Sequence, residues 1–168
     1  LEAYQVTGRD DFADVARSIL RYVARDMTSP AGAFYSATDA DSRGPDGTRE
    51  EGWFFTWTPD EIAAVVGPEQ AGAVSAYFGV TDDGNFEGER TVLHVSRSRL
   101  DVARDLSISP DELGRLIDDA RELLYAARRE RPAPLRDEKI LNGWNGLMIS
   151  AFARAALALG EDAYAERA

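Results

Sequence analysis

The stretch from Asn142 to Leu159 constrains the fold more than any other part of this chain. A surface helix has one apolar stripe and a polar face, whereas a helix that is apolar on most of its circumference is packed on most sides. At helical spacing, one face of this stretch is made by Trp144, Leu147, Met148, Ala151, Phe152 and Ala155, and the other by Ile149, Ala153 and Leu157. The sequence therefore predicts a helix with neighbours on most sides, within a mainly helical body.

Two other long segments have the pattern of amphipathic helices. From Asp11 to Met27, apolar residues recur at intervals of three and four behind a capping pattern at Thr7 and Asp10. Ser109-Pro-Asp-Glu112 is a capping box with proline at the first helical position, and an apolar stripe follows it to Ala127. We expect one helix in each segment.

Shorter helices and strands are predicted between these segments. Thr58-Pro-Asp-Glu61 repeats the capping pattern, and it opens a helix that ends near Gly67 and is followed by another through Ala71 to Phe78. Aromatic or β-branched runs bounded by Gly, Asp and Ser predict short strands or hairpins that project from the helical body, at Ala33–Ala37, Gly52–Thr58 and Thr91–Val95.

A weak internal repeat supports helices arranged in pairs. Gly8-Arg-Asp-Asp-Phe-Ala-Asp-Val-Ala16 matches Gly160-Glu-Asp-Ala-Tyr-Ala-Glu-Arg-Ala168, and each copy follows an apolar segment. In both copies we expect one helix to end at the glycine and its partner to begin at once. The two copies are too far apart for a regular solenoid of about 34 residues per repeat, but an array of helical hairpins fits.

Composition excludes several classes of function. Thirty acidic against nineteen basic residues give a net charge of −11, which repels a nucleic-acid backbone. No segment has the roughly 20 apolar residues of a membrane span, and no signal peptide opens the chain. The absence of cysteine excludes disulfides, zinc thiolate sites and CxxC redox chemistry within these residues and fits a cytoplasmic protein.

Three strings together resemble a known family. They are GAFYSATDADSRGPDGTREEGWFFTW (Gly32–Trp57), FGVTDDGNFEG (Phe78–Gly88) and DEKILNGWNGLMISAF (Asp137–Phe152). They resemble the spermatogenesis-associated family whose members carry a thioredoxin-like domain, and whose helical part is similar to the six-hairpin toroids of glycosidases and sugar epimerases. The resemblance implies that residues 1–168 are a fragment of one (α/α) toroid domain with short β-hairpins. It also implies that the thioredoxin-like domain lies outside this chain, whose two ends look cut.

Polar and aromatic residues are concentrated just before and at the start of the apolar helix. Asp137, Lys139, Asn142, Trp144 and Asn145 fall within nine residues, and carboxylates are electrostatically favoured near a helix N-terminus. The resemblance to helical toroids implies a sugar pocket lined by such helix ends. The alternative is purely structural, with Asp137 capping the helix and Trp144 filling the core.

Sugar chemistry uses two carboxylates across a pocket, with aromatic rings that stack on the pyranose. We expect Asp137 to face Asp39 or Asp41, which belong to the DADS segment that is a signature of the resembled family. The aromatic platforms expected for the substrate are Tyr35, Trp53 and Trp144. Lys139 either neutralises a substrate carboxylate or forms a surface ion pair.

The acidic loop around Asp41 has two further interpretations. Asp39, Asp41, Gly44 and Glu50 imitate the spacing of a calcium-binding loop, but Arg43 stands where an oxygen ligand is required and the flanks are not helical. The other interpretation is a solvated hairpin turn with Pro45-Asp46-Gly47 at its tip. We predict no metal site and no cofactor.

The remaining candidate residues lie in a glycine-bounded turn. Asn85 and Glu87 can bind sugar hydroxyls, although a tight turn selects the same residue types. Epimerases of similar fold rely on histidines, and the single histidine, His94, has the pattern of a half-buried strand residue. No phosphate-binding glycine loop or GxSxG elbow is present.

The sequence thus predicts a helical fragment with a saccharide pocket, whose activity is that of a glycosidase or a sugar epimerase. The alternative is a non-catalytic helical scaffold that supports the thioredoxin-like domain or a protein partner. Truncation of the toroid would also leave apolar surface through which the fragment associates with itself. The position of the acids distinguishes these two functions. Catalysis requires Asp137 and Asp39 or Asp41 to converge on one concavity, whereas a scaffold leaves them dispersed on the surface.

Overall fold

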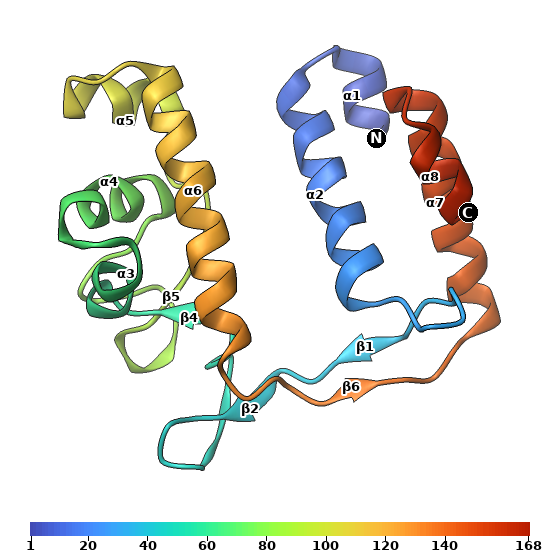
Figure 1. The fold of residues 1–168 in the computed structure, drawn as a ribbon, viewed down its shortest axis with the longest axis horizontal. Coiled ribbons are helices and arrows are strands. Elements are labelled where there is room, and N and C mark those ends of the chain that lie inside the picture. Colours follow the sequence, from blue (N-terminus) through green and yellow to red (C-terminus); the bar gives the residue numbers. More distant parts are fainter. The chain divides into compact units, whose positions relative to one another are not determined.

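The computed structural model describes residues 1–168 and is mainly helical, with three small antiparallel strand pairs (Figure 1). The helices are α1 (Glu2–Thr7), α2 (Asp10–Asp26), α3 (Pro59–Val66), α4 (Pro68–Phe78), α5 (Arg99–Leu106), α6 (Pro110–Arg129), α7 (Asn142–Leu159) and α8 (Asp162–Arg167), with a 3-10 turn η1 (Glu87–Glu89). The strands are β1 (Ala37–Thr38), β2 (Asp41–Arg43), β3 (Arg49–Glu51), β4 (Thr56–Trp57), β5 (Thr91–Val92) and β6 (Arg136–Asp137). The chain divides into two compact units, formed by Leu1–Asp39 with Arg136–Ala168 and by Ala40–Leu135.

The first unit consists of two helical hairpins, α1–α2 and α7–α8, from opposite ends of the sequence (Figure 1). Gly8 ends α1 at φ 67° and Gly160 ends α7 at φ 70°. In both cases the glycine N–H donates to a carbonyl four residues back, and the next helix begins two residues later. This left-handed conformation strains any residue with a Cβ atom. The helix-glycine-helix arrangement predicted from the repeat is therefore confirmed.

A small aromatic core holds the first unit together. Phe34 stacks on Phe152 of α7 with ring centroids 5.4 Å apart and planes 8° from parallel. Leu20 of α2 and Ala155 of α7 complete the buried cluster. The loop that carries Phe34 is closed on itself just after α2, since Thr28 and Phe34 form a β-bridge.

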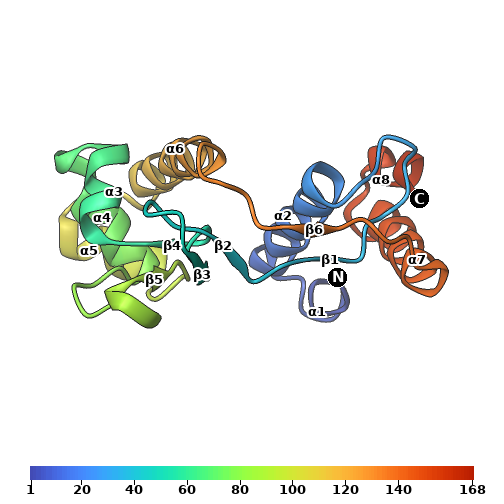
Figure 2. The ribbon, with the colours of Figure 1, turned by 90° about the horizontal axis from the view of Figure 1, so that it is seen from below.

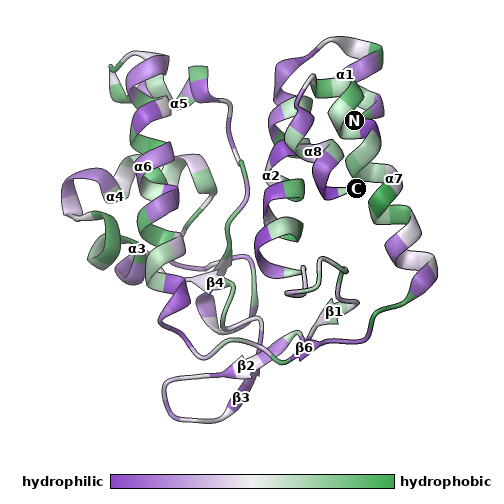
Figure 3. Ribbon diagram, turned by 45° about the vertical axis from the view of Figure 1, so that its right-hand side comes forward, coloured by the Kyte–Doolittle hydropathy of each residue, from purple (hydrophilic) through white to green (hydrophobic).

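The prediction that the apolar helix has neighbours on most sides is wrong for this chain. α7 packs against α2 and α8 and buries only Phe152 and Ala155. Its other apolar side chains stay exposed, among them Leu147 at 69% and Leu157 at 88%. Figure 3 shows the corresponding hydrophobic colouring along the middle of α7. The apolar pattern showed which side chains favour burial. Within these 168 residues, however, other elements cover only the side of α7 that carries Phe152 and Ala155.

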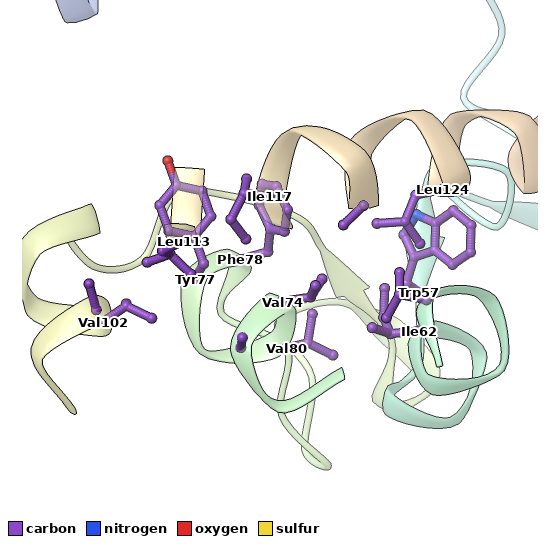
Figure 4. Close-up of a cluster of buried hydrophobic side chains, with 14 residues drawn as sticks. Trp57, Ile62, Val74, Tyr77, Phe78, Val80, Val102, Leu113, Ile117 and Leu124 are labelled. Carbon is purple, nitrogen blue, oxygen red and sulfur yellow. The ribbon is translucent and has the colours of Figure 1, made fainter. Parts of the chain in front are cut away.

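The second unit has a larger core beneath α6. Helices α3, α4 and α5 pack on α6, and Figure 4 shows their apolar side chains converging. The fully buried members include Ile62, Val74, Val102, Leu113 and Ile117. Leu113, Ile117, Ala120 and Leu124 recur at intervals of three and four along α6 and face this core, as the apolar stripe predicts.

The start signals of two of these helices, α3 and α6, were predicted correctly. Thr58 accepts a hydrogen bond from the Glu61 N–H, while the Glu61 carboxylate accepts one from the Thr58 N–H, which forms a complete capping box. Ser109 accepts from the Glu112 N–H at the start of α6. The sequence analysis did not predict α5, which begins at a Ser98 cap and has a weaker apolar pattern.

The strands form three separate antiparallel pairs, and each is short. Figure 2 shows β1 beside β6, with Ala37 opposite Asp137 and Thr38 opposite Arg136. β2 pairs with β3, and β4 pairs with β5. The expected β segments are therefore present only in part: Ala37 is the one residue of the predicted run at residues 33–37 that lies in a strand, and two residues of each predicted run at residues 52–58 and 91–95 do so.

These observations confirm a mainly helical fold with small β-hairpins. The toroidal arrangement stays a prediction. No helix of the chain combines the length and the apolar character that crossing a membrane requires.

Candidate functional site

The first unit contains an apolar pocket of about 380 Å³ between α2, α7 and the loop that joins α2 to β1. α2 contributes Tyr22 and Val23 at the point where its last turn meets that loop. The other lining residues are Met27, Phe34, Tyr35, Ser36, Trp144, Asn145, Leu147 and Met148. The pocket is thus made by aromatic and aliphatic side chains with few polar groups, as small-molecule sites commonly are.

Two of the three predicted aromatic platforms line this pocket. Tyr35 lies in the loop and Trp144 in the first turn of α7, where 54% of its surface is exposed. The Arg136 guanidinium lies 4.3 Å from the centroid of the Tyr35 ring, and it also donates to the Asp26 carbonyl and pairs with Glu138. Tyr35 is therefore fixed by a cation–π contact, while Trp144 presents much of its ring to solvent.

Asn145 connects the two walls of the pocket. Its Oδ1 accepts a hydrogen bond from the Phe34 N–H at 2.8 Å, and its Nδ2 donates to the Phe34 carbonyl at 2.9 Å. Nδ2 also approaches the Leu141 carbonyl at 3.2 Å. In the structure both ends of the amide bind backbone groups, so Asn145 positions the loop that carries Tyr35.

Asp137 lies in β6 and is hydrogen-bonded through its backbone to Ser36, a lining residue of the pocket. Its Oδ1 accepts a hydrogen bond from the Lys139 N–H at 3.2 Å, and its Oδ2 lies 3.1 Å from the Lys139 ammonium. Its backbone carbonyl accepts from the N–H and the hydroxyl of Ser36, which lines the pocket. The alternative in which Asp137 caps α7 is wrong, because the N-terminal capping position is Leu141, which provides no side-chain cap.

The carboxylate of Asp137 is held in its ionised form. The Lys139 backbone N–H, assisted by the Lys139 ammonium and the Ser36 hydroxyl, lowers the pKa of Asp137 below its usual value. A carboxyl with a lowered pKa suits a base or a hydrogen-bond acceptor and does not suit a general acid at neutral pH. Lys139 forms the predicted surface ion pair with this carboxylate, and the side chain of Lys139 is mostly exposed.

The remaining candidates of the first unit are Asn142 and Asp39. Asn142 is the first residue of α7 and is exposed. Asp39 is partly buried and follows β1 by one residue. Ala37 of β1 is the strand partner of Asp137 in β6, and Asp39 lies two residues after Ala37 along the chain.

Four predicted site residues belong to the second unit. Asp41 opens the β2–β3 hairpin and pairs with Arg49 at 3.7 Å. Trp53 is buried, with the Arg131 guanidinium 5.0 Å from its ring. Asn85 binds the backbone of Val92 through both ends of its amide, and Glu87 lies exposed at the start of η1. The contacts of Trp53 and Asn85 are therefore those of residues that stabilise the fold of this unit.

The acidic loop is the hairpin turn that one interpretation predicted. The Gly44 N–H donates to the Thr48 carbonyl, and the Asp46 carboxylate accepts hydrogen bonds from the N–H and hydroxyl of Thr48. These hydrogen bonds lower the pKa of Asp46. Pro45-Asp46-Gly47 forms the tip, and the chain returns in β3.

The sequence analysis did not assign Tyr22, Met27 or Ser36 to the site. Met27 belongs to the apolar stripe of the segment from Asp11 to Met27, which is typical of core packing, and Tyr22 lies outside that stripe. Arg136 was also missed, although it immediately precedes the predicted cluster at Asp137. The sequence around Arg136 gives no signal of this contact, because Tyr35 belongs to a distant segment.

Comparison with known proteins identifies relatives of this segment. No family model matches the chain. The chain is 34% identical over 180 residues to spermatogenesis-associated protein 20 of Homo sapiens, a match that covers 96% of this chain and 23% of the human protein. The protein of the same name from Rattus norvegicus is 34% identical over 95% of the chain, and that from Mus musculus is 33% identical over 95%.

The chain spans about a quarter of the length of these relatives, 23% for the human and rat proteins and 22% for the mouse protein. The match extends over nearly all 168 residues, including both units and the strings on which the resemblance was based. The chain is homologous to one segment of spermatogenesis-associated protein 20, and this similarity supports its assignment to the spermatogenesis-associated family.

Proposed function

We propose that the pocket of the first unit binds a saccharide. The observation that supports this proposal is that Tyr35 and Trp144 line one pocket together with Ser36, whose N–H and hydroxyl donate to the backbone carbonyl of Asp137. Sugars present apolar C–H faces that stack on aromatic rings and hydroxyls that donate to carboxylates. The aromatic walls provide the first type of contact, and the ionised carboxylate of Asp137, which adjoins the lining residue Ser36, is the candidate for the second.

We propose further that Asp137 acts on the sugar as a base or a hydrogen-bond acceptor. Its lowered pKa keeps the carboxylate ionised at neutral pH, so the general acid of a glycosidase would have to be another group. Asp39 is the candidate within the same unit, because it is partly buried and lies two residues after Ala37, the strand partner of Asp137. An epimerase would instead use the Asp137 carboxylate to remove a proton from a carbon atom of the sugar.

A thermal-shift titration with monosaccharides and disaccharides tests binding. A ligand that binds only the native state adds about 2.7 kcal/mol of stability at one hundred times its dissociation constant. We expect one class of sugar to raise the Tm of the wild-type chain and the Trp144→Ala variant to lose that shift. Leu157→Ala is the matched control, because Leu157 is an exposed residue of the same helix and does not line the pocket. Equal shifts in the two variants would reject the assignment of Trp144.

A second titration tests the carboxylate. Asp137→Asn keeps the shape of the side chain but removes its charge, and we expect it to weaken sugar binding by about tenfold or more. Glu166→Gln removes an exposed carboxylate elsewhere in the same unit and serves as the control. If Asp137→Asn binds sugar as tightly as the control, the role proposed for Asp137 is wrong.

The exposed face of α7 favours a second function, that of a helical scaffold. Leu147, Ile149 and Leu157 are exposed on α7, and Gly143 and Gly146 leave open space beside the helix backbone. Small residues allow a second helix to approach closely, and exposed apolar patches mark interaction surfaces. We propose that an apolar helix from the remainder of the longer protein covers this face, as the toroid and its thioredoxin-like domain would require.

Amide hydrogen exchange tests whether another helix covers the exposed face of α7. We expect the amides of α7 to exchange more slowly in the full-length protein than in the 168-residue chain, because packing suppresses local opening. The amides of α6, whose core lies within these residues, provide the internal reference. Unchanged exchange in α7 would mean that this face stays uncovered.

A further inference from the structure

The start of α7 contains two asparagine-glycine pairs, Asn142-Gly143 and Asn145-Gly146. An asparagine that precedes glycine is prone to deamidation, because glycine has no side chain to hinder attack by its own backbone nitrogen on the asparagine carboxamide. The chain has one other asparagine, Asn85, which precedes a phenylalanine. The two pairs lie about one helical turn apart, so the structure can be compared at two sites with the same dipeptide.

The Asn142-Gly143 pair is accessible and unrestrained. Both residues are exposed, and the space beside the Gly143 backbone is open. Leu141 provides no side-chain cap, and neither the Asn142 carboxamide nor the Gly143 N–H has a hydrogen-bond partner within the chain. Helix ends fray, and the first N–H groups of a helix have no intrahelical partner. Fraying releases the Asn142 backbone from the helical conformation, which the attack by the Gly143 nitrogen requires.

The Asn145-Gly146 pair is held against the same reaction. Asn145 Oδ1 accepts a hydrogen bond from the Phe34 N–H at 2.8 Å, and its Nδ2 donates to the Phe34 carbonyl at 2.9 Å. The carboxamide must leave both hydrogen bonds before it can react. Gly146 lies farther inside the helix, where each N–H donates to the carbonyl four residues earlier. Reaction at Asn145 therefore needs the helix and the contact with the loop to open together.

We propose that Asn142 is a site of spontaneous deamidation. The Gly143 nitrogen, after losing its proton to solvent, forms a bond to Cγ of Asn142, and the Nδ2 group leaves as ammonia. One water molecule then opens the cyclic imide by breaking either C–N bond of the ring, which leaves a carboxylate. The product is aspartate, or isoaspartate when the main chain continues through the former side-chain carbonyl. The net change is the gain of one water and the loss of one ammonia.

The modification changes the charge of the helix that carries part of the pocket wall. It adds a negative charge to the first turn of α7, where the helix dipole favours an anion. Trp144, two residues later, lines the pocket. The isoaspartate form also lengthens the backbone between residues 142 and 143. The reaction needs no enzyme, so modified chains accumulate with time.

Peptide mapping by mass spectrometry tests the site after incubation of the 168-residue chain at mildly alkaline pH. We expect Asn142 to deamidate at least about tenfold faster than Asn145 in the native chain, because Asn145 reacts only when its hydrogen bonds open. In urea both pairs are released, and their rates should become similar. A native chain that does not react at Asn142, or that reacts equally at both sites, would disprove the proposal. A difference that persists unchanged in urea would overturn its structural explanation.

A capping variant tests why Asn142 reacts. A serine at the N-terminal capping position accepts a hydrogen bond from the second or third N–H of its helix, which here belongs to Gly143 or Trp144. Leu141→Ser should therefore slow deamidation of Asn142 by about fivefold while the asparagine-glycine pair stays intact. Leu157→Ser is the matched control, because it changes an exposed leucine near the other end of α7 and should leave the rate unchanged. Equal rates in the two variants would show that the uncapped helix start is not what exposes Asn142.

Discussion

At the scale of single residues, amides and carboxylates that look like ligand-binding groups also have structural partners. Asn145 binds the backbone of Phe34, and Asp137 accepts hydrogen bonds from Lys139. The sequence could identify these polar residues because they interrupt apolar segments. It could not show their partners, since Phe34 lies 111 residues from Asn145 and only the folded chain brings them together.

Removal of the Asn145 amide should destabilise the first unit. Asn145→Ala leaves the Phe34 N–H and carbonyl without their partners, and we expect a loss of about 1–3 kcal/mol in the free energy of unfolding. Urea denaturation measures this loss. Asn142→Ala, at the exposed first residue of the same helix, should change stability much less. Equal losses in the two variants would show that the hydrogen bonds between Asn145 and the Phe34 backbone contribute nothing to the free energy of unfolding.

The Asp137 carboxylate should make stability depend on acid pH. Because its folded-state pKa is lowered, its contribution is present above the unfolded pKa of about 3.9 and is lost as the pH falls through the folded value. Wild-type protein should therefore lose more stability than Asp137→Asn on acidification through this range. The Asp137 carboxyl can be titrated directly by NMR, and an apparent pKa at or above the usual value would contradict the structure.

At the scale of elements, capped helices were predictable and the short strands were only partly so. Capping boxes and prolines act locally, so Thr58 and Ser109 specified the starts of α3 and α6. Strands of two or three residues depend on pairing with distant segments, as Thr56 does with Val92. The exposed face of α7 could not be foreseen, because an apolar pattern does not say which neighbours the chain provides.

Two glycines near the ends of α7 should respond to alanine with opposite signs. Gly160 has φ 70° and no neighbouring atoms, so Gly160→Ala should cost about 1–2 kcal/mol through backbone strain alone. Gly146 lies inside the helix, also in open space, and Gly146→Ala should stabilise by about 0.5–1 kcal/mol. Chemical denaturation of both variants checks the signs, and destabilisation by Gly146→Ala would indicate that something covers this face.

Arg131 should be the most sensitive polar residue of the second unit. Its buried guanidinium donates to the carbonyls of Trp53 and Thr56 and lies 3.3 Å from the Glu61 carboxylate. Arg131→Ala would leave these acceptors unpaired next to β4, and we expect a loss of about 3 kcal/mol or more. The neighbouring exposed residue gives the control, Arg129→Ala, whose effect on urea denaturation should be below about 1 kcal/mol.

At the scale of the whole molecule, the chain forms two compact units, and the proposed saccharide pocket belongs to the first. The first unit joins the two ends of the sequence, while the second is one continuous segment. The repeat around Gly8 and Gly160 predicted the paired hairpins of the first unit. The division itself follows from contacts between distant segments, which periodicity and composition do not encode.

The most direct test of saccharide binding uses the three tryptophan indole N–H signals in a two-dimensional NMR spectrum. Trp144 lines the proposed saccharide pocket, whereas Trp53 and Trp57 are buried in the second unit and act as internal references. Titration with the sugar that gives the largest thermal shift should move the Trp144 signal and leave the other two in place. A stationary Trp144 signal at saturating sugar would contradict the proposed site.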